Sequence, residues 1–186
     1  MEHINIWSDI VDRNSSLALI LEDDAVFVPF FREKLERTIR TAIRTGALKI
    51  GGLSQCARSS VHLPTTSDEW FEQDPMIMIG SCMLLFDSGF NTRRRDSPPI
   101  LSTHKVASSR CSHAYLLTAC SARALLKQIT VRKSHFLQSD LLLDALVAAS
   151  PTLQSFWLDP PIAYQGNRIT DLDGISSFGR VTYADN

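Results

Sequence analysis

The chain has 186 residues, of which 44% are hydrophobic and 21% charged, and its formal net charge is −1 at pH 7. This length suits one domain with a real core, and the balanced charge gives no reason to expect a nucleic-acid partner or a membrane surface. No apolar run approaches the roughly 18 residues of a membrane span, and no targeting peptide precedes the first predicted helix. Cytoplasm and endoplasmic reticulum or Golgi lumen therefore both stay open as locations.

A helix is predicted at the start of the chain, because its apolar residues recur at helical spacing on one face. These residues are Ile4, Trp7, Ile10 and Val11. A turn over 14–16 then leads into an apolar run over 17–21 that is typical of a buried strand.

Three consecutive acids, Glu22, Asp23 and Asp24, close this apolar run. Strand alternation would send Glu22 and Asp24 to one side and Asp23 to the other. Because adjacent carboxylates repel one another, the site would gain from a hard divalent cation such as Mg²⁺ or Mn²⁺, which prefers oxygen ligands. The carboxyl end of a buried strand is also where open α/β sheets bind ligands. The alternative is an acidic strand exit that helps solubility or caps the next helix.

The later elements alternate between helix and strand. In chain order they are a loop around Pro29, a helix over 31–43, an apolar run over 76–86, a strand over 113–118, a helix over 121–129 capped by Ser121, a helix over 140–149 capped by Ser139, and a strand over 155–158. Such alternation predicts a single α/β domain over 1–186, with a mostly parallel sheet flanked by helices.

Two segments carry no periodic pattern. The segment 87–112 is predicted to be a flexible loop, and its arginines at 93–95 could meet a diphosphate or an acidic acceptor, or form a solvated charge run. The segment 166–186 is predicted to be a loop-rich tail. The four cysteines lack metal-site spacing, so free buried thiols are the default interpretation, and a pair among them is possible in an oxidising lumen.

Several motifs occur together in a recognisable order. They are ALILEDDA at 18–25, MIGSC at 78–82, HAYLLT at 113–118 with ARALL at 122–126, SDLLL at 139–143, and DPPIAYQ at 159–165. This order resembles glycosyltransferase family 25, which includes lipooligosaccharide and collagen β-galactosyltransferases. The resemblance implies a GT-A-like, Rossmann-like fold and a nucleotide-sugar donor, UDP-linked. It also implies inverting transfer of galactose or glucose to a glycan, lipooligosaccharide or protein acceptor.

The resemblance also implies roles for the three acids. Asp24 would be the direct ligand of Mn²⁺ or Mg²⁺, and Glu22 would join it from the same face. Asp23 would reach the ribose of the donor or a metal-bound water. A cation held in this way would neutralise the leaving diphosphate as a Lewis acid.

Further roles fall on residues later in the chain. An inverting displacement needs a base for the acceptor hydroxyl, and the resemblance assigns it to Asp140, with Asp144 as the second choice. Asp140 could instead be an ordinary helix-start acid. His113 either faces the donor or is a strand-end histidine with satisfied hydrogen bonds. Gln165 and Ser177 lie where the tail of the family folds back over the site.

The start of the chain departs from the family pattern. Family members normally begin with a strand and helix that end in C-x-x-S-H, and only His3 could match the last residue of that segment. We therefore expect an N-terminally truncated sheet, explained by a truncated gene model, a degenerate homologue or a partner that supplies the strand. Two functions follow: a metal-dependent hexosyltransferase, or a non-catalytic remnant that binds a partner or a sugar. A two-metal phosphatase or nuclease is less favoured, because no further acid or histidine cluster would complete its site.

Overall fold

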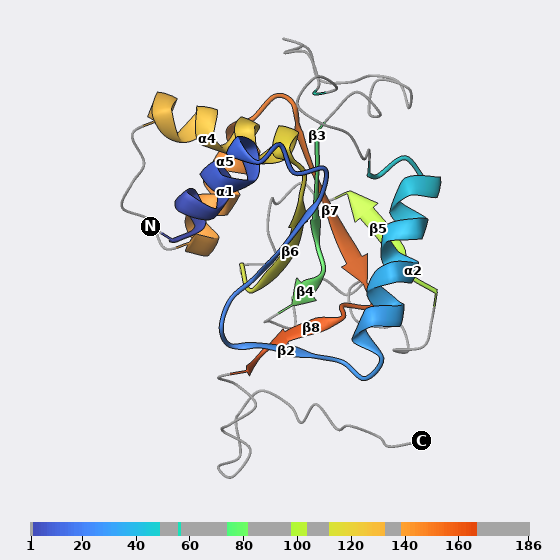
Figure 1. Cartoon of the computed structure of the whole chain (residues 1–186). Helices are drawn as coiled ribbons and strands as arrows, with labels where there is room; N and C mark the ends of the chain where they lie inside the picture. The colour runs from blue at the N-terminus through green and yellow to red at the C-terminus, as the bar shows by residue number, and fades with distance from the viewer. Residues whose placement is uncertain are drawn as a thin grey trace.

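The computed structural model describes residues 2–48, 56, 74–81, 98–103, 112–132 and 139–166. Within these ranges there are four helices: α1 (Glu2–Asp12), α2 (Phe31–Arg44), α4 (Ala119–Arg132) and α5 (Ser139–Ala149). The strands are β1 (Ala18–Leu21), β2 (Ala25–Phe27), β3 (Asp74–Met78), β4 (Gly80–Ser81), β5 (Ile100–Thr103), β6 (Ala114–Leu117), β7 (Leu153–Asp159) and β8 (Ala163–Gln165). The predicted α/β class is confirmed (Figure 1).

The sheets are mixed, so the prediction of a mostly parallel sheet is wrong. The larger sheet has the order β1-β6-β3-β7-β5, and its one parallel pair of neighbouring strands is β3 and β7. The smaller sheet has the order β2-β8-β4, with β2 antiparallel and β4 parallel to β8. The prediction failed because strand β6 enters between β1 and β3 in the opposite direction to both. Alternation of helices and strands along the chain does not determine the direction in which each strand enters.

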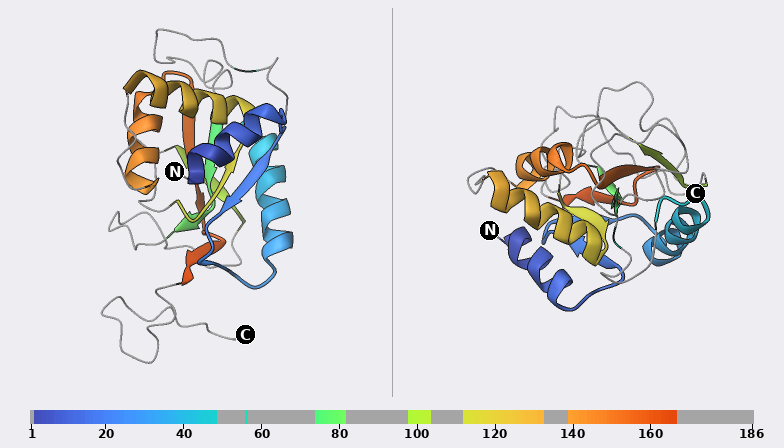
Figure 2. Two further views of the ribbon diagram at one scale, coloured as in Figure 1. Left: turned by 60° about the vertical axis from the view of Figure 1, so that its left-hand side comes forward. Right: turned by 90° about the horizontal axis from the view of Figure 1, so that it is seen from above.

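Helices cover both faces of the larger sheet. Helices α1, α4 and α5 lie on one face and α2 lies on the other (Figure 2). Successive side chains of β3 point to opposite faces of the sheet and so pack against both helix layers. Met76 and Met78 pack with α1, α4 and α5, whereas Ile77 packs on the side of α2. A strand with both faces covered reads as a continuous apolar run, as the sequence over 76–79 does.

Three short strands were not anticipated. Strands β2 and β8 pair with each other beside the acidic residues. The sequence predicted a loop where β2 lies and no strand after residue 158, where β8 lies. Strand β5 lies within the 87–112 segment, of which only 98–103 and 112 are described. Among the described residues, none of the helices combines the length and apolar character that crossing a bilayer would require.

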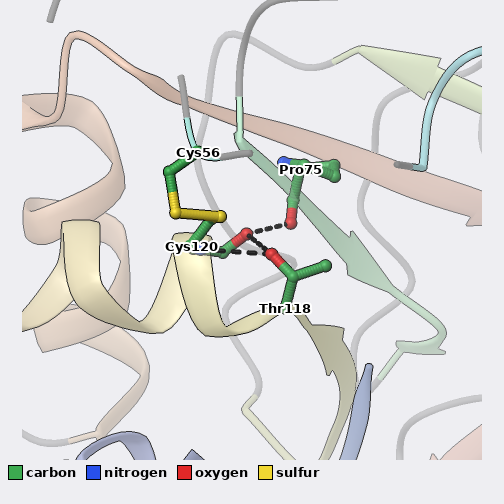
Figure 3. The surroundings of a disulfide bond; sticks show 5 residues. Cys56, Pro75, Thr118 and Cys120 are labelled. Atoms are coloured by element: carbon green, nitrogen blue, oxygen red, sulfur yellow. Dashed lines mark hydrogen bonds between the residues drawn. A yellow bond between two sulfur atoms is a disulfide. The ribbon is translucent and has the colours of Figure 1, made fainter. Parts of the chain in front are cut away.

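Helix α4 begins earlier than predicted, and a disulfide holds its first turn. The Thr118 hydroxyl, rather than that of Ser121, serves as the cap, because its oxygen accepts the Ser121 backbone N–H at 3.2 Å. Cys120 forms a disulfide with Cys56, with a Cα–Cα distance of 5.1 Å (Figure 3). The default of free thiols is therefore wrong for these two cysteines, while Cys82 and Cys111 lie outside the described residues.

Candidate functional site around the acidic turn

The three acids form a tight turn between β1 and β2. The Ala25 backbone N–H donates to the Glu22 carbonyl at 3.1 Å, and the Glu22 N–H donates to the His113 carbonyl at 2.9 Å. The turn is thus fixed against the residue that precedes β6. Asp23 is exposed, whereas Glu22 and Asp24 are partly buried. Asp23 and Asp24 lie in the turn and not in a strand, so strand alternation does not set their directions.

Glu22 is held by two side chains from distant parts of the sequence. Its Oε1 accepts a hydrogen bond from the Ser112 hydroxyl at 2.5 Å and lies 3.1 Å from His3 Nε2. The hydrogen bond from His3 is the main cause that lowers the pKa of Glu22, and burial opposes it. Glu22 therefore stays ionised below the pH at which a free glutamate would protonate, with one oxygen already engaged.

The other nitrogen of His3 lies next to a buried tyrosine. His3 Nδ1 is 2.7 Å from the Tyr115 hydroxyl, which also accepts a hydrogen bond from Trp7 Nε1 at 3.0 Å. Burial raises the pKa of Tyr115 above the range in which tyrosines normally titrate. A chain of polar groups thus runs from Trp7 through Tyr115 and His3 to Glu22, and it links α1 to the acidic turn.

Asp24 has a buried carboxylate oxygen for which the described residues offer no hydrogen-bond partner. Its Oδ1 is inaccessible to solvent and unpaired within the part of the chain that the structure describes. Its carbonyl accepts the Gly166 N–H at 2.5 Å, and Gln165 pairs with Ala25 across β2 and β8. A buried carboxylate oxygen without a donor is unfavourable unless a cation or another group satisfies it. The structure therefore places Gln165 beside the turn and leaves Asp24 able to accept a ligand.

His113 is fully buried beside the turn, against Gly80. A Cβ built on Gly80 would lie 2.9 Å from the His113 ring carbons Cδ2 and Cε1, so only glycine leaves room for the ring. Neither ring nitrogen completes a hydrogen bond of ordinary geometry within the described ranges. Burial lowers the pKa of His113, while the Ala163 backbone and the carboxylates of Glu22 and Asp24 act in the opposite direction. The ring is therefore a neutral group facing the acids.

Comparison with known protein families adds one finding to this geometry. A model described as glycosyltransferase family 25 (LPS biosynthesis protein) matches residues 1–143, more than half of the chain. The chain belongs to glycosyltransferase family 25. A search of curated proteins returned no match. Membership in glycosyltransferase family 25 suggests glycosyltransferase activity, and the matched residues include the acidic turn, His113 and Asp140.

Helix α5 begins toward the end of the larger sheet at which the acidic turn lies. Strands β1, β3 and β7 run in one direction, and α5 precedes β7 through a short link, so α5 begins at the end where these strands finish. The left view of Figure 2 shows α5 running alongside the strands. Asp140 is the second residue of α5. Asp144 lies one turn further along, is partly buried, and falls beyond the residues that match family 25.

Three residues that hold Glu22 directly or through one another were not predicted from the sequence as part of the site: His3, Ser112 and Tyr115. Only His3 carried a signal, as the possible last residue of the family's C-x-x-S-H segment. Ser112 and Tyr115 flank the histidine of the HAYLLT motif, but nothing in their spacing indicates that they contact α1 or Glu22. Ser177 lies outside the described residues.

Proposed function

We propose that the protein is a metal-dependent, inverting hexosyltransferase with a GT-A-like fold, which uses a UDP-linked galactose or glucose donor. The acceptor would be a glycan, a lipooligosaccharide or a protein. The observation that carries the proposal is the buried Oδ1 of Asp24, which has no hydrogen-bond partner among the described residues, in a chain that belongs to glycosyltransferase family 25. A carboxylate oxygen in that position fits a hard cation.

Each of the three acids would have a different role in this site. Asp24 would hold Mn²⁺ or Mg²⁺ through Oδ1. Glu22, whose Oε1 accepts from Ser112 and lies beside His3, would join Asp24 as a ligand and contribute its negative charge. Asp23 is exposed and free to meet the ribose or a metal-bound water. When bound, the cation would supply Lewis-acid stabilisation of the leaving diphosphate.

The neighbouring residues would line the donor site and activate the acceptor. His113, neutral and buried beside the acids, would line the donor side without adding a competing positive charge. Gln165, opposite Ala25 in β8, would bound the site on the tail side. Asp140, at the start of α5, would accept the proton of the acceptor hydroxyl as it attacks, and Asp144 is the alternative base.

Calorimetry with UDP-galactose and UDP-glucose, with and without Mn²⁺, tests the donor site. We expect binding heat only with the metal, and its loss in Asp24→Asn. Asp12→Asn is a matched control, because Asp12 is an exposed acid at the end of α1. Heat that is independent of the metal, or unchanged in Asp24→Asn, would contradict the proposed ligand.

Turnover of the two α5 variants tests the base. Asp140→Asn is expected to lower kcat by roughly 10²- to 10⁴-fold while donor binding persists, since a general base acts in the transition state. If Asp144→Asn shows that loss and Asp140→Asn does not, the second aspartate is the base.

A non-catalytic binding domain is the second candidate function. It is favoured by the engagement of Glu22 Oε1 by His3 and Ser112, which leaves fewer free oxygens for a cation. Absence of heat with either donor, in the presence and absence of Mn²⁺, would support this candidate.

A further inference from the structure

Three metal-ligand side chains meet beside the first turn of α4, away from the acidic turn. The sulfurs of Cys56 and Cys120 and a carboxylate oxygen of Asp74 all lie within 4.8 Å of one another. Asp74 begins β3 and is buried, with an exposed fraction of 6%. The sulfurs form a disulfide in this structure, so the group is present in its oxidised form.

We propose that reduction of this disulfide creates a zinc site formed by Cys56, Cys120 and Asp74. A dithiol reductant would supply two electrons and two protons, and would itself become a disulfide as the Cys56–Cys120 bond breaks. Zn²⁺ would then displace the two thiol protons. Two thiolates and one carboxylate suit Zn²⁺, with water in the fourth position.

The charges of the reduced site favour a cation. Two thiolates beside a buried carboxylate would place three negative groups together with little water to screen them. Cys120 also lies in the first turn of α4, where the helix dipole stabilises a thiolate. Protonation or a bound cation would relieve the repulsion, and a soft divalent ion would do so while keeping the thiolates ionised.

Two of the three ligands are held in place without the disulfide. The Ser121 hydroxyl donates to the Pro75 carbonyl, which ties the first turn of α4 to the residue after Asp74 (Figure 3). The Asp74 backbone N–H donates to the Thr152 carbonyl at 2.7 Å. After reduction the sulfurs need to separate only to about 3.8 Å to bind one ion tetrahedrally at about 2.3 Å. Rotation of the two cysteine side chains would provide most of this change.

The proposal does not depend on the glycosyltransferase activity. The acidic turn offers oxygen ligands that suit Mn²⁺ or Mg²⁺, whereas this site offers two sulfurs that select softer ions. Loss of one site therefore leaves the other measurable, and either proposal can fail alone.

The test uses the full chain with Cys82→Ser and Cys111→Ser, so that only the two cysteines of the proposed site can supply thiolates. Zn²⁺ is titrated against a chelating indicator into the oxidised protein and into the protein reduced with a dithiol that is then removed. Because the acidic turn could also take Zn²⁺, the readout is the difference between the two forms, and we expect the reduced form to bind one equivalent more than the oxidised form. Cys56→Ser and Asp74→Asn should each weaken binding at least about 10-fold.

Cobalt absorption provides a second readout that does not require the Asp74 variant to fold. Co²⁺ added to the reduced protein should give thiolate-to-cobalt charge-transfer bands whose intensity corresponds to two sulfurs. It should also give the d–d bands of a tetrahedral cobalt ion. Absence of zinc binding by the reduced protein would overturn the proposal. Equal zinc binding by Cys56→Ser, or a cobalt spectrum without thiolate bands, would overturn it as well.

Discussion

The close packing of Gly80 against His113 allows a quantitative test of the site's architecture. In Gly80→Ala the new Cβ would lie 2.9 Å from two carbons of the imidazole, well inside the 3.4 Å at which ordinary contact begins. The ring is fully buried and cannot swing into solvent. We expect the strain to destabilise the fold by about 1–3 kcal/mol, the usual range for an overpacked core. For a chain of this length, each kcal/mol lowers the Tm by roughly 2–4 °C.

Urea unfolding of a double-mutant cycle separates this clash from other effects of the substitution. In the His113→Ala background the imidazole is gone, so Gly80→Ala should become nearly neutral, and the coupling energy should fall in the range of about 0.5–3 kcal/mol. The disulfide is kept oxidised in all four proteins. The reasoning is refuted if Gly80→Ala leaves the unfolding free energy unchanged in the wild-type background. Equal destabilisation in both backgrounds would also refute it.

Two further changes test other contacts of the site, and a third tests the disulfide. Tyr115→Phe should destabilise by about 1–3 kcal/mol because the Trp7 N–H loses its acceptor, as measured by urea unfolding. Burial raises the pKa of Tyr115, so the contribution of the neutral phenol to folding stability is complete below pH about 10. This contribution is lost as the pH rises toward the pKa that Tyr115 has in the folded state. Tyr115→Phe should therefore lose less stability than the wild type over that alkaline range. Gly166→Ala should weaken folding and donor binding together, since its Cβ would lie 2.6 Å from the Asp24 carbonyl oxygen, and unchanged calorimetry would argue against this contact. Cys56→Ser removes a cross-link over a sequence separation of 64 and should lower stability by about 4 kcal/mol; a melting temperature equal to that of the oxidised wild type would contradict this.

The sequence alone was sufficient for the four helices and the main strands, although not for β2, β5 and β8, and it was sufficient for the location of the acids. The spacing of apolar residues along α1 and α2 is a local property, and so is the closure of an apolar run by the three acids. The prediction that this run is a buried strand is wrong, because β1 lies at the edge of the larger sheet and leaves Leu19 and Leu21 exposed. Such patterns record which face of a segment avoids water, and this information is contained within one or two turns of chain. The family resemblance, confirmed over residues 1–143, extended these local signals to a function class.

Only the tertiary structure decided which distant residues meet. His3 reaches Tyr115 across 112 positions and Ser112 reaches Glu22 across 90, and no local pattern encodes such pairs. The direction of β6 was equally undetermined, because an apolar strand buried on both faces reads the same in either direction. Strand directions, the cysteine pairing and the partners of Glu22 are set by the packing of the whole chain, since each depends on which of several similar apolar segments lies beside it.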